Sequence, residues 1–103
     1  MSTYQSTLSG RTEVAKGTMA FWFKKPHDSV FKAGQYIDLA LSGSPSGSPN
    51  GLTHSFSIAS SPFDEDVVVT TRMRPTAFKR DLSLLPIGAG VRIEGPMGSF
   101  YPP

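Results

Sequence analysis

A short segment near the middle of the chain carries the residue types that a flat ligand ring with a polar edge requires. It reads His54-Ser55-Phe56-Ser57-Ile58. Phe56 offers an aromatic face for stacking, and Ser57 with the backbone of Ile58 offers hydrogen bonds to the edge of such a ring. The same residues also fit an ordinary strand, in which Phe56 and Ile58 pack in the core and the serines face solvent. Their types and spacing alone leave both interpretations open.

Positive charge gathers further along the chain, around a predicted helix start. Four of the ten basic residues lie between Arg72 and Arg80. A helix start leaves backbone N–H groups unpaired and has a partial positive charge, so Thr76, Ala77, Phe78 and Lys79 are predicted to form an anion site. Cations in a first helical turn are unfavourable to the helix itself, which favours a bound anion such as a pyrophosphate. The alternative is a solvated basic turn.

The elements that must position these residues are mostly strands. Glycine and proline together supply 19 residues and separate short segments in which apolar and polar residues alternate. This period of two is typical of strands. Strands are predicted near residues 4–14, 18–25, 35–42, 53–60, 66–73 and 90–95.

One segment departs from the period of two. Phe78, Leu82 and Leu85 follow one another at helical spacing, Thr76 is a suitable N-cap, and Pro86 ends the run. The predicted fold class is therefore all-β: a six-stranded antiparallel Greek-key barrel with one short helix before the last strand, which plugs the open end. The Gly-, Ser- and Pro-rich stretch 42–51 is predicted to be a polar loop.

Composition narrows the class of protein. A length of 103 residues fits one domain, and a net charge of +2 gives no general attraction to nucleic acid. The chain has no cysteine, and its two histidines lie 27 residues apart, so no metal site is expected. It shows no signal peptide and no apolar run of membrane length, so a cytoplasmic location without a membrane partner is predicted.

The order of these motifs resembles the FAD-binding domain of the ferredoxin–NADP⁺ reductase family, whose signature is Arg-x-Tyr-Ser followed by a phosphate-binding turn. In that family the arginine contacts the pyrophosphate, the tyrosine packs on the flavin, and the serine approaches its edge. The resemblance assigns these roles to His54, Phe56 and Ser57. The segments Phe31–Tyr36 and Gly90–Gly98 resemble two further turns of the family, in the same order along the chain.

The resemblance implies FAD as the cofactor and a set of contacting residues. Ser57 is the residue expected at the reacting edge of the flavin. The residues expected to bind FAD are His54, Ser55, Phe56, Ser57, Ile58, Thr71, Arg72, Arg74, Thr76, Ala77, Phe78, Lys79 and Gly98. Two of them depart from the signature: a neutral histidine lacks the bidentate fork of arginine, and phenylalanine lacks the phenolic hydroxyl. Both residues are compatible with a flavin ligand, but they predict weaker binding than the signature residues would.

The resemblance also implies a function. Reductases of this family carry a second domain that binds NADP(H) or NAD(H) and begins just after the Gly-Pro-x-Gly turn, whereas this sequence stops at Tyr101-Pro102-Pro103. Residues 1–103 are thus expected to form the FAD-binding domain alone, an electron-transfer module without a nicotinamide site. Its expected partners are an NAD(P)-binding domain or subunit and a redox protein such as ferredoxin. The alternatives are an oligonucleotide-binding barrel that stacks bases on Phe56, or a barrel without a cofactor that serves as an interaction domain.

Overall fold

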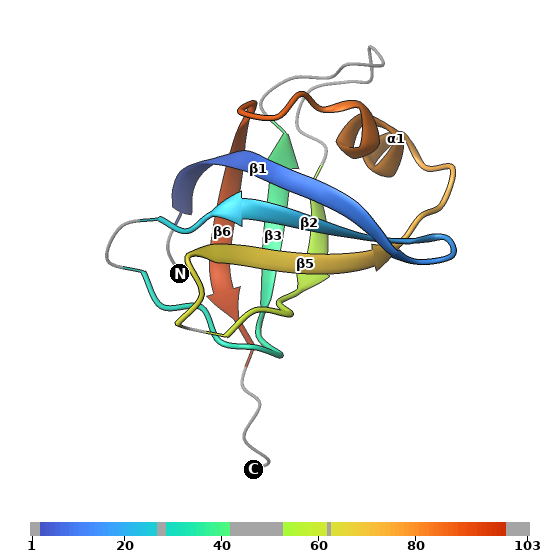
Figure 1. The fold of residues 1–103 in the computed structure, drawn as a ribbon. Helices are drawn as coiled ribbons and strands as arrows, with labels where there is room; N and C mark the ends of the chain where they lie inside the picture. The colour runs from blue at the N-terminus through green and yellow to red at the C-terminus, as the bar shows by residue number, and fades with distance from the viewer. Residues whose placement is uncertain (1–2, 27–28, 42–52, 62, 99–103) are drawn as a thin grey trace.

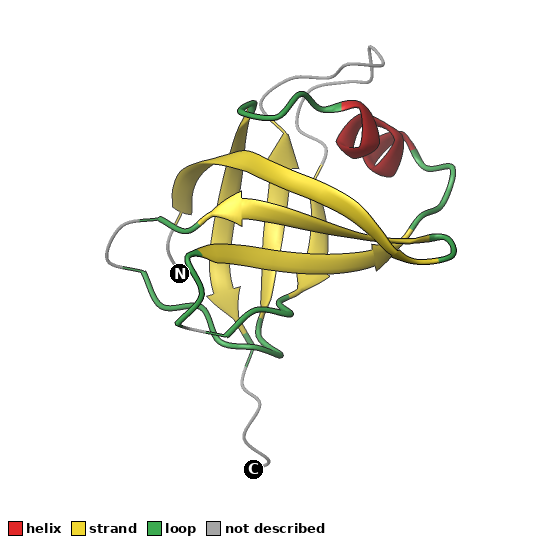
Figure 2. Cartoon of the chain, viewed as in Figure 1, coloured by secondary structure: helices red, strands yellow, loops and turns green. Residues whose placement is uncertain are grey.

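The computed structural model describes residues 3–26, 29–41, 53–61 and 63–98. They form six strands and one helix (Figures 1 and 2). The elements are β1 (Thr3–Ala15), β2 (Thr18–Lys24), β3 (Tyr36–Leu41), β4 (Thr53–Ser57), β5 (Asp66–Arg72), α1 (Ala77–Leu84) and β6 (Gly90–Met97). All six predicted strands are confirmed, although β4 ends at Ser57, three residues before the predicted end. The predicted polar loop at 42–51 lies outside the described residues.

All strand pairs are antiparallel, in the order β4-β3-β6-β1-β2-β5. The long strand β1 joins the two halves: Thr3–Thr7 pairs with β6, and the part from Leu8 onward pairs with β2. In Figure 1, β1, β2 and β5 therefore cross in front of β3, β4 and β6. Among the described residues, no strand ladder joins the edge strands β4 and β5; an isolated bridge links Val69 to Ile58, which follows β4. The antiparallel six-stranded fold is as predicted, but the barrel is not closed by a full strand pair.

The core lies between the two layers and follows from the alternation of apolar residues. On β2 and β5, Phe21 pairs with Val69 and Phe23 pairs with Val67, and all four side chains are fully buried. Removing such side chains from water provides about 1.5–3 kcal/mol each. The core cluster consists of Leu8, Phe21, Phe23, Phe31, Ile37, Leu39, Phe56, Ile58, Val67, Val69, Phe78, Leu82, Leu85, Val91 and Ile93.

Helix α1 covers one end of the barrel, as Figure 1 shows. Its predicted N-cap is confirmed, because the Thr76 hydroxyl accepts a hydrogen bond from the backbone N–H of Lys79 at 3.3 Å. Phe78 and Leu82 on one face of the helix are buried in the core. Beyond the helix, the carbonyl of Leu85 accepts a hydrogen bond from the Arg11 guanidinium. In the described part of the chain, no helix has the length and apolar character needed to cross a membrane.

Candidate functional site

The predicted stacking residue Phe56 lies in a cluster of three aromatic rings. The imidazole of His54 stacks on Phe56 with 4.7 Å between ring centroids and 26° between planes. Phe78 of α1 lies 5.9 Å from Phe56 and 5.5 Å from His54. We call His54, Phe56 and Phe78 the aromatic cluster. It connects β4 to the first turn of α1, and it leaves Phe56 only 4% exposed.

Strand alternation explains this burial. Phe56 and Ile58 are buried and His54 is half-buried, whereas Ser55 and Ser57 are exposed on the other face of β4. The Ser55 hydroxyl donates to the Asp38 carboxylate on β3, and the His54 imidazole Nδ1 lies 2.9 Å from the Ser55 carbonyl oxygen. This arrangement matches the strand-packing interpretation of the segment, in which the serines face outward and Phe56 belongs to the core.

The basic residues near the helix start do not all face solvent. Arg72, the last residue of β5, and Arg74 are both exposed. Lys79 is only 8% exposed, and its Nζ donates to the backbone carbonyl of Arg72 at 2.6 Å. Its charge therefore ties α1 to the end of β5. Among the predicted binding residues from 71 to 79, the exposed cations are Arg72 and Arg74.

The backbone of the first turn of α1 completes this region. The N–H of Lys79 is taken by the Thr76 hydroxyl, and the N–H of Arg80 donates to the Thr76 carbonyl at 2.9 Å. The Lys79 N–H, predicted to be part of the anion site, is therefore used by the cap, and the N–H groups of Ala77 and Phe78 are the first-turn donors that the helix itself cannot satisfy. Together with the arginines, they make the start of α1 suitable for an anion. We call the segment Arg72–Lys79 the helix-start site; the half-buried Thr71, also predicted to bind, immediately precedes it.

Ser57 and Gly98 both neighbour Tyr36, from the strands on either side of β3. Tyr36 is the strand partner of Ser57 on β4 and of Met97 on β6. Gly98 has a φ angle of +86°, and a Cβ built on it would lie 3.0 Å from two ring carbons of Tyr36. The Tyr36 ring therefore rests against the Gly98 backbone. Sequence reasoning did not assign Tyr36 a role, although its alternation with Ile37 on β3 could have shown that it faces outward.

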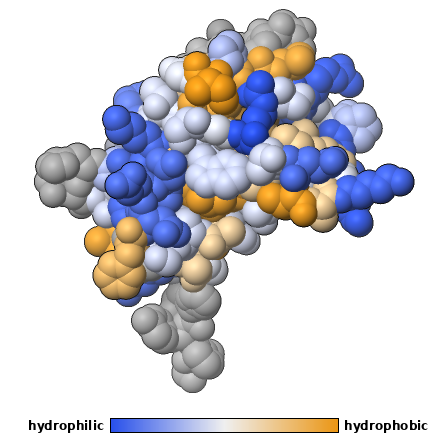
Figure 3. All heavy atoms as spheres, in the orientation of Figure 1, coloured by the Kyte–Doolittle hydropathy of each residue, from blue (hydrophilic) through white to orange (hydrophobic). Residues whose placement is uncertain are grey.

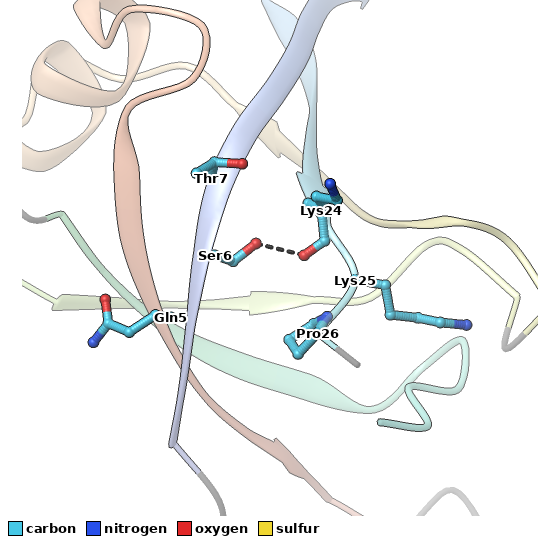
Figure 4. Close-up of a pocket in the computed structure, with 6 residues that line it drawn as sticks. All are labelled: Gln5, Ser6, Thr7, Lys24, Lys25 and Pro26. Atoms are coloured by element: carbon cyan, nitrogen blue, oxygen red, sulfur yellow. Dashed lines mark hydrogen bonds between the residues drawn. The ribbon is translucent and has the colours of Figure 1, made fainter. Parts of the chain in front are cut away.

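Two hollows among the described residues lie away from the predicted site. One, of about 390 Å³, is lined by Gln5, Ser6, Thr7, Lys24, Lys25 and Pro26, where β1 diverges from β2 (Figure 4). The Ser6 hydroxyl donates to the Lys24 carbonyl across it. Another, of about 340 Å³, is lined by Trp22, Asp64, Glu65, Asp66 and Val68. None of these residues belongs to the predicted site, which is a surface along β4, the helix start and the end of β6.

The described residues offer no metal site, and their surface carries mixed polarity. No three of their His, Asp or Glu side chains are grouped so that they could hold a metal ion. On the face shown in Figure 3, apolar and polar side chains are interleaved.

Comparison with known proteins identifies the fold. The chain matches no protein-family profile. It is 28% identical over 102 residues to the electron transfer component of toluate 1,2-dioxygenase from Pseudomonas putida, a match that covers 95% of this chain and 29% of that protein. The chain thus spans less than a third of this relative.

The fold is shared with solved structures, among them two reductases. The ferredoxin reductase in carbazole 1,9a-dioxygenase superposes with a TM-score of 0.80 at 20% identity, covering 99% of this chain and 30% of the reductase. A ferredoxin–NADP⁺ reductase from Neisseria gonorrhoeae, solved with bound FAD and NADP, gives a TM-score of 0.76 at 14% identity, covering 97% of this chain and 40% of that one. The resemblance that the motifs indicated is therefore confirmed in the fold.

Proposed function

Because this chain has the fold of the FAD-binding domain of the ferredoxin–NADP⁺ reductase family, we propose that it binds FAD and serves as an electron-transfer module. The observation that carries the proposal is the helix-start site: two exposed arginines, Arg72 and Arg74, immediately precede a capped helix start on this fold. Arginine and first-turn N–H groups are the donors that a pyrophosphate needs.

The residues of the helix-start site suit the pyrophosphate of FAD. Arg72 and Arg74 supply charge, and the amides of Ala77 and Phe78 supply directed donors. His54 lies next to this turn, through its ring contact with Phe78. Its Nδ1 faces a carbonyl, which only accepts hydrogen bonds, so Nδ1 carries a proton and Nε2 is the atom left for a phosphate. Nε2 donates only when the imidazole is charged, so a neutral His54 contributes little.

The other end of the site suits the ring. Ser57 is exposed, so its hydroxyl is available to the edge of a flavin lying along β4. Bound FAD would supply hydride acceptance from a nicotinamide and one-electron transfer to an acceptor. The role of this chain is to bind and orient the cofactor. NAD(P)H would be held by another domain or subunit, and electrons would pass to a redox protein such as ferredoxin, in line with the named role of the toluate dioxygenase relative. A cytoplasmic location remains a prediction.

The oligonucleotide-binding alternative required Phe56 as a stacking surface for bases. At 4% exposure and with His54 stacked on it, Phe56 offers no free face for a base. The alternative of an interaction barrel without a cofactor makes a different prediction, namely that no flavin binds.

Titration of the purified chain with FAD tests the proposal. We expect a shifted visible absorption band, one FAD retained per chain, and an unfolding midpoint that rises with FAD concentration, since a ligand at about 100 times its Kd adds about 2.7 kcal/mol. An FAD spectrum identical to that of the free compound, with no change in the unfolding midpoint, would instead support the interaction barrel.

A further inference from the structure

We infer that Tyr36, rather than Phe56, is the aromatic residue of this chain that faces the flavin ring. The inference rests on the proposed binding of FAD and adds to it the residue that positions the ring.

The first step concerns the access to Phe56. One of its faces is covered by the imidazole of His54 at 4.7 Å, and its ring also approaches Phe78 at 5.9 Å. A flavin could stack on Phe56 only after His54 left this position and gave up the contact of Nδ1 with the Ser55 carbonyl. Phe56 also belongs to the core cluster, so moving its own ring outward would open the core.

The second step concerns the position of Tyr36. Its side chain is 41% exposed, which leaves a large part of the phenol ring available to a ligand. Tyr36 and Ser57 are direct partners across β3 and β4, and partners in an antiparallel pair project to the same face. Tyr36 is therefore beside the hydroxyl that the proposed function places at the flavin edge. Phe56 projects to the opposite face of the same strand.

The third step concerns how the Tyr36 ring is held. A Cβ on Gly98 would lie 3.0 Å from the ring carbons Cδ1 and Cε1 of Tyr36, so the ring edge lies directly against the glycine backbone. The φ angle of +86° at Gly98 also disfavours other residues. A ring fixed in this way loses less conformational freedom when a ligand stacks on it. Glycine at position 98 thus has a defined purpose: it gives room to Tyr36.

The experiment compares Tyr36→Leu with Phe56→Leu, two variants that replace an aromatic ring by an aliphatic side chain. The readouts are the fluorescence of saturated, bound FAD and the Kd, with folding checked by circular dichroism. Because an aromatic ring stacked on a flavin quenches its fluorescence, we expect brighter bound FAD in Tyr36→Leu and an affinity about two- to tenfold lower. Bound FAD in Phe56→Leu should be as dim as in wild type. Tyr36→Phe, which keeps the ring, should restore the quenching.

The outcomes separate this inference from the proposed function. If FAD binds and Tyr36→Leu leaves its fluorescence and affinity unchanged, the inference is wrong and the proposed function stands. If the fluorescence of bound FAD rises in Phe56→Leu but not in Tyr36→Leu, then Phe56 is the residue that stacks on the flavin. If wild-type protein binds no FAD, the proposed function fails, and the role of Tyr36 fails with it.

Discussion

The helix-start site and the aromatic cluster were predicted from the same kind of motif match, yet the structure treats them differently. At the helix start, Thr76 caps α1, and Arg72 and Arg74 face solvent, where an anion can reach them. In the aromatic cluster, Phe56 is turned into the core and His54 covers it. The first region keeps two cations exposed to solvent, whereas the aromatic rings of the second are packed against one another within the chain.

The difference shows which parts of a binding motif depend on local rules. A helix N-terminus has unpaired N–H donors wherever it occurs, so its capacity to attract an anion can be predicted from the capping pattern alone. By contrast, the role of an aromatic residue on a strand can be assigned only when it is known which face of the strand is buried. On β4 the inward face includes both His54 and Phe56, so the residues of the ring-binding signature pack against each other.

Truncating Phe56 gives the largest expected effect and tests whether the aromatic cluster is structural. Removal of a buried phenylalanine costs about 3–5 kcal/mol, so Phe56→Ala should lower the free energy of unfolding by about that much in urea titrations. Phe63→Ala, at a position that is 94% exposed, is the matched control and should change it by less than about 0.5 kcal/mol. A Phe56→Ala variant as stable as wild type would show that Phe56 is not part of the core.

Lys79→Met separates the buried lysine of the helix-start site from its two exposed arginines. Methionine keeps the apolar stem but loses the hydrogen bond to the Arg72 carbonyl, so the free energy of unfolding should fall by about 1.5–3 kcal/mol. The exposed Lys32→Met is the control for the loss of one charge. A sharp loss of FAD affinity at unchanged stability would mean that the Lys79 ammonium turns outward to the ligand.

Replacing both exposed arginines tests whether the helix-start site binds the ligand. The Arg72→Ala/Arg74→Ala variant should lose FAD affinity tenfold to hundredfold, about 1.4–2.7 kcal/mol, while its stability stays near that of wild type. Lys24→Ala/Arg92→Ala removes two exposed charges far from the helix start in sequence and controls for net charge. Equal FAD affinities for the two double variants would mean that Arg72 and Arg74 do not contact FAD and belong to a solvated basic turn.

Much of the fold could be predicted from the sequence because it follows local rules. The alternation of Phe21 and Phe23 with Ala20 and Trp22 indicated β2, and the spacing of Phe78 and Leu82 with the cap at Thr76 indicated α1. The incomplete closure between β4 and β5 could not be predicted, because it depends on how two edge strands distant in sequence meet at the Ile58–Val69 bridge.

The candidate site was predictable only in part, for the same reason. The sequence placed Lys79 in a basic turn, but only tertiary packing showed its ammonium bound to the Arg72 carbonyl. Likewise, Tyr36 lies 21 positions before Ser57 and 62 before Gly98, so their proximity arises from strand pairing and not from any single motif.

The most direct test of the central claim, that the helix start holds a pyrophosphate, is the ratio of the Kd values of riboflavin and FAD for the same preparation. The two compounds share the flavin ring but only FAD carries the pyrophosphate. We predict that FAD binds at least about tenfold more tightly, a difference of about 1.4 kcal/mol, and that added salt narrows the gap. Equal affinities for FAD and riboflavin at low salt would contradict the account.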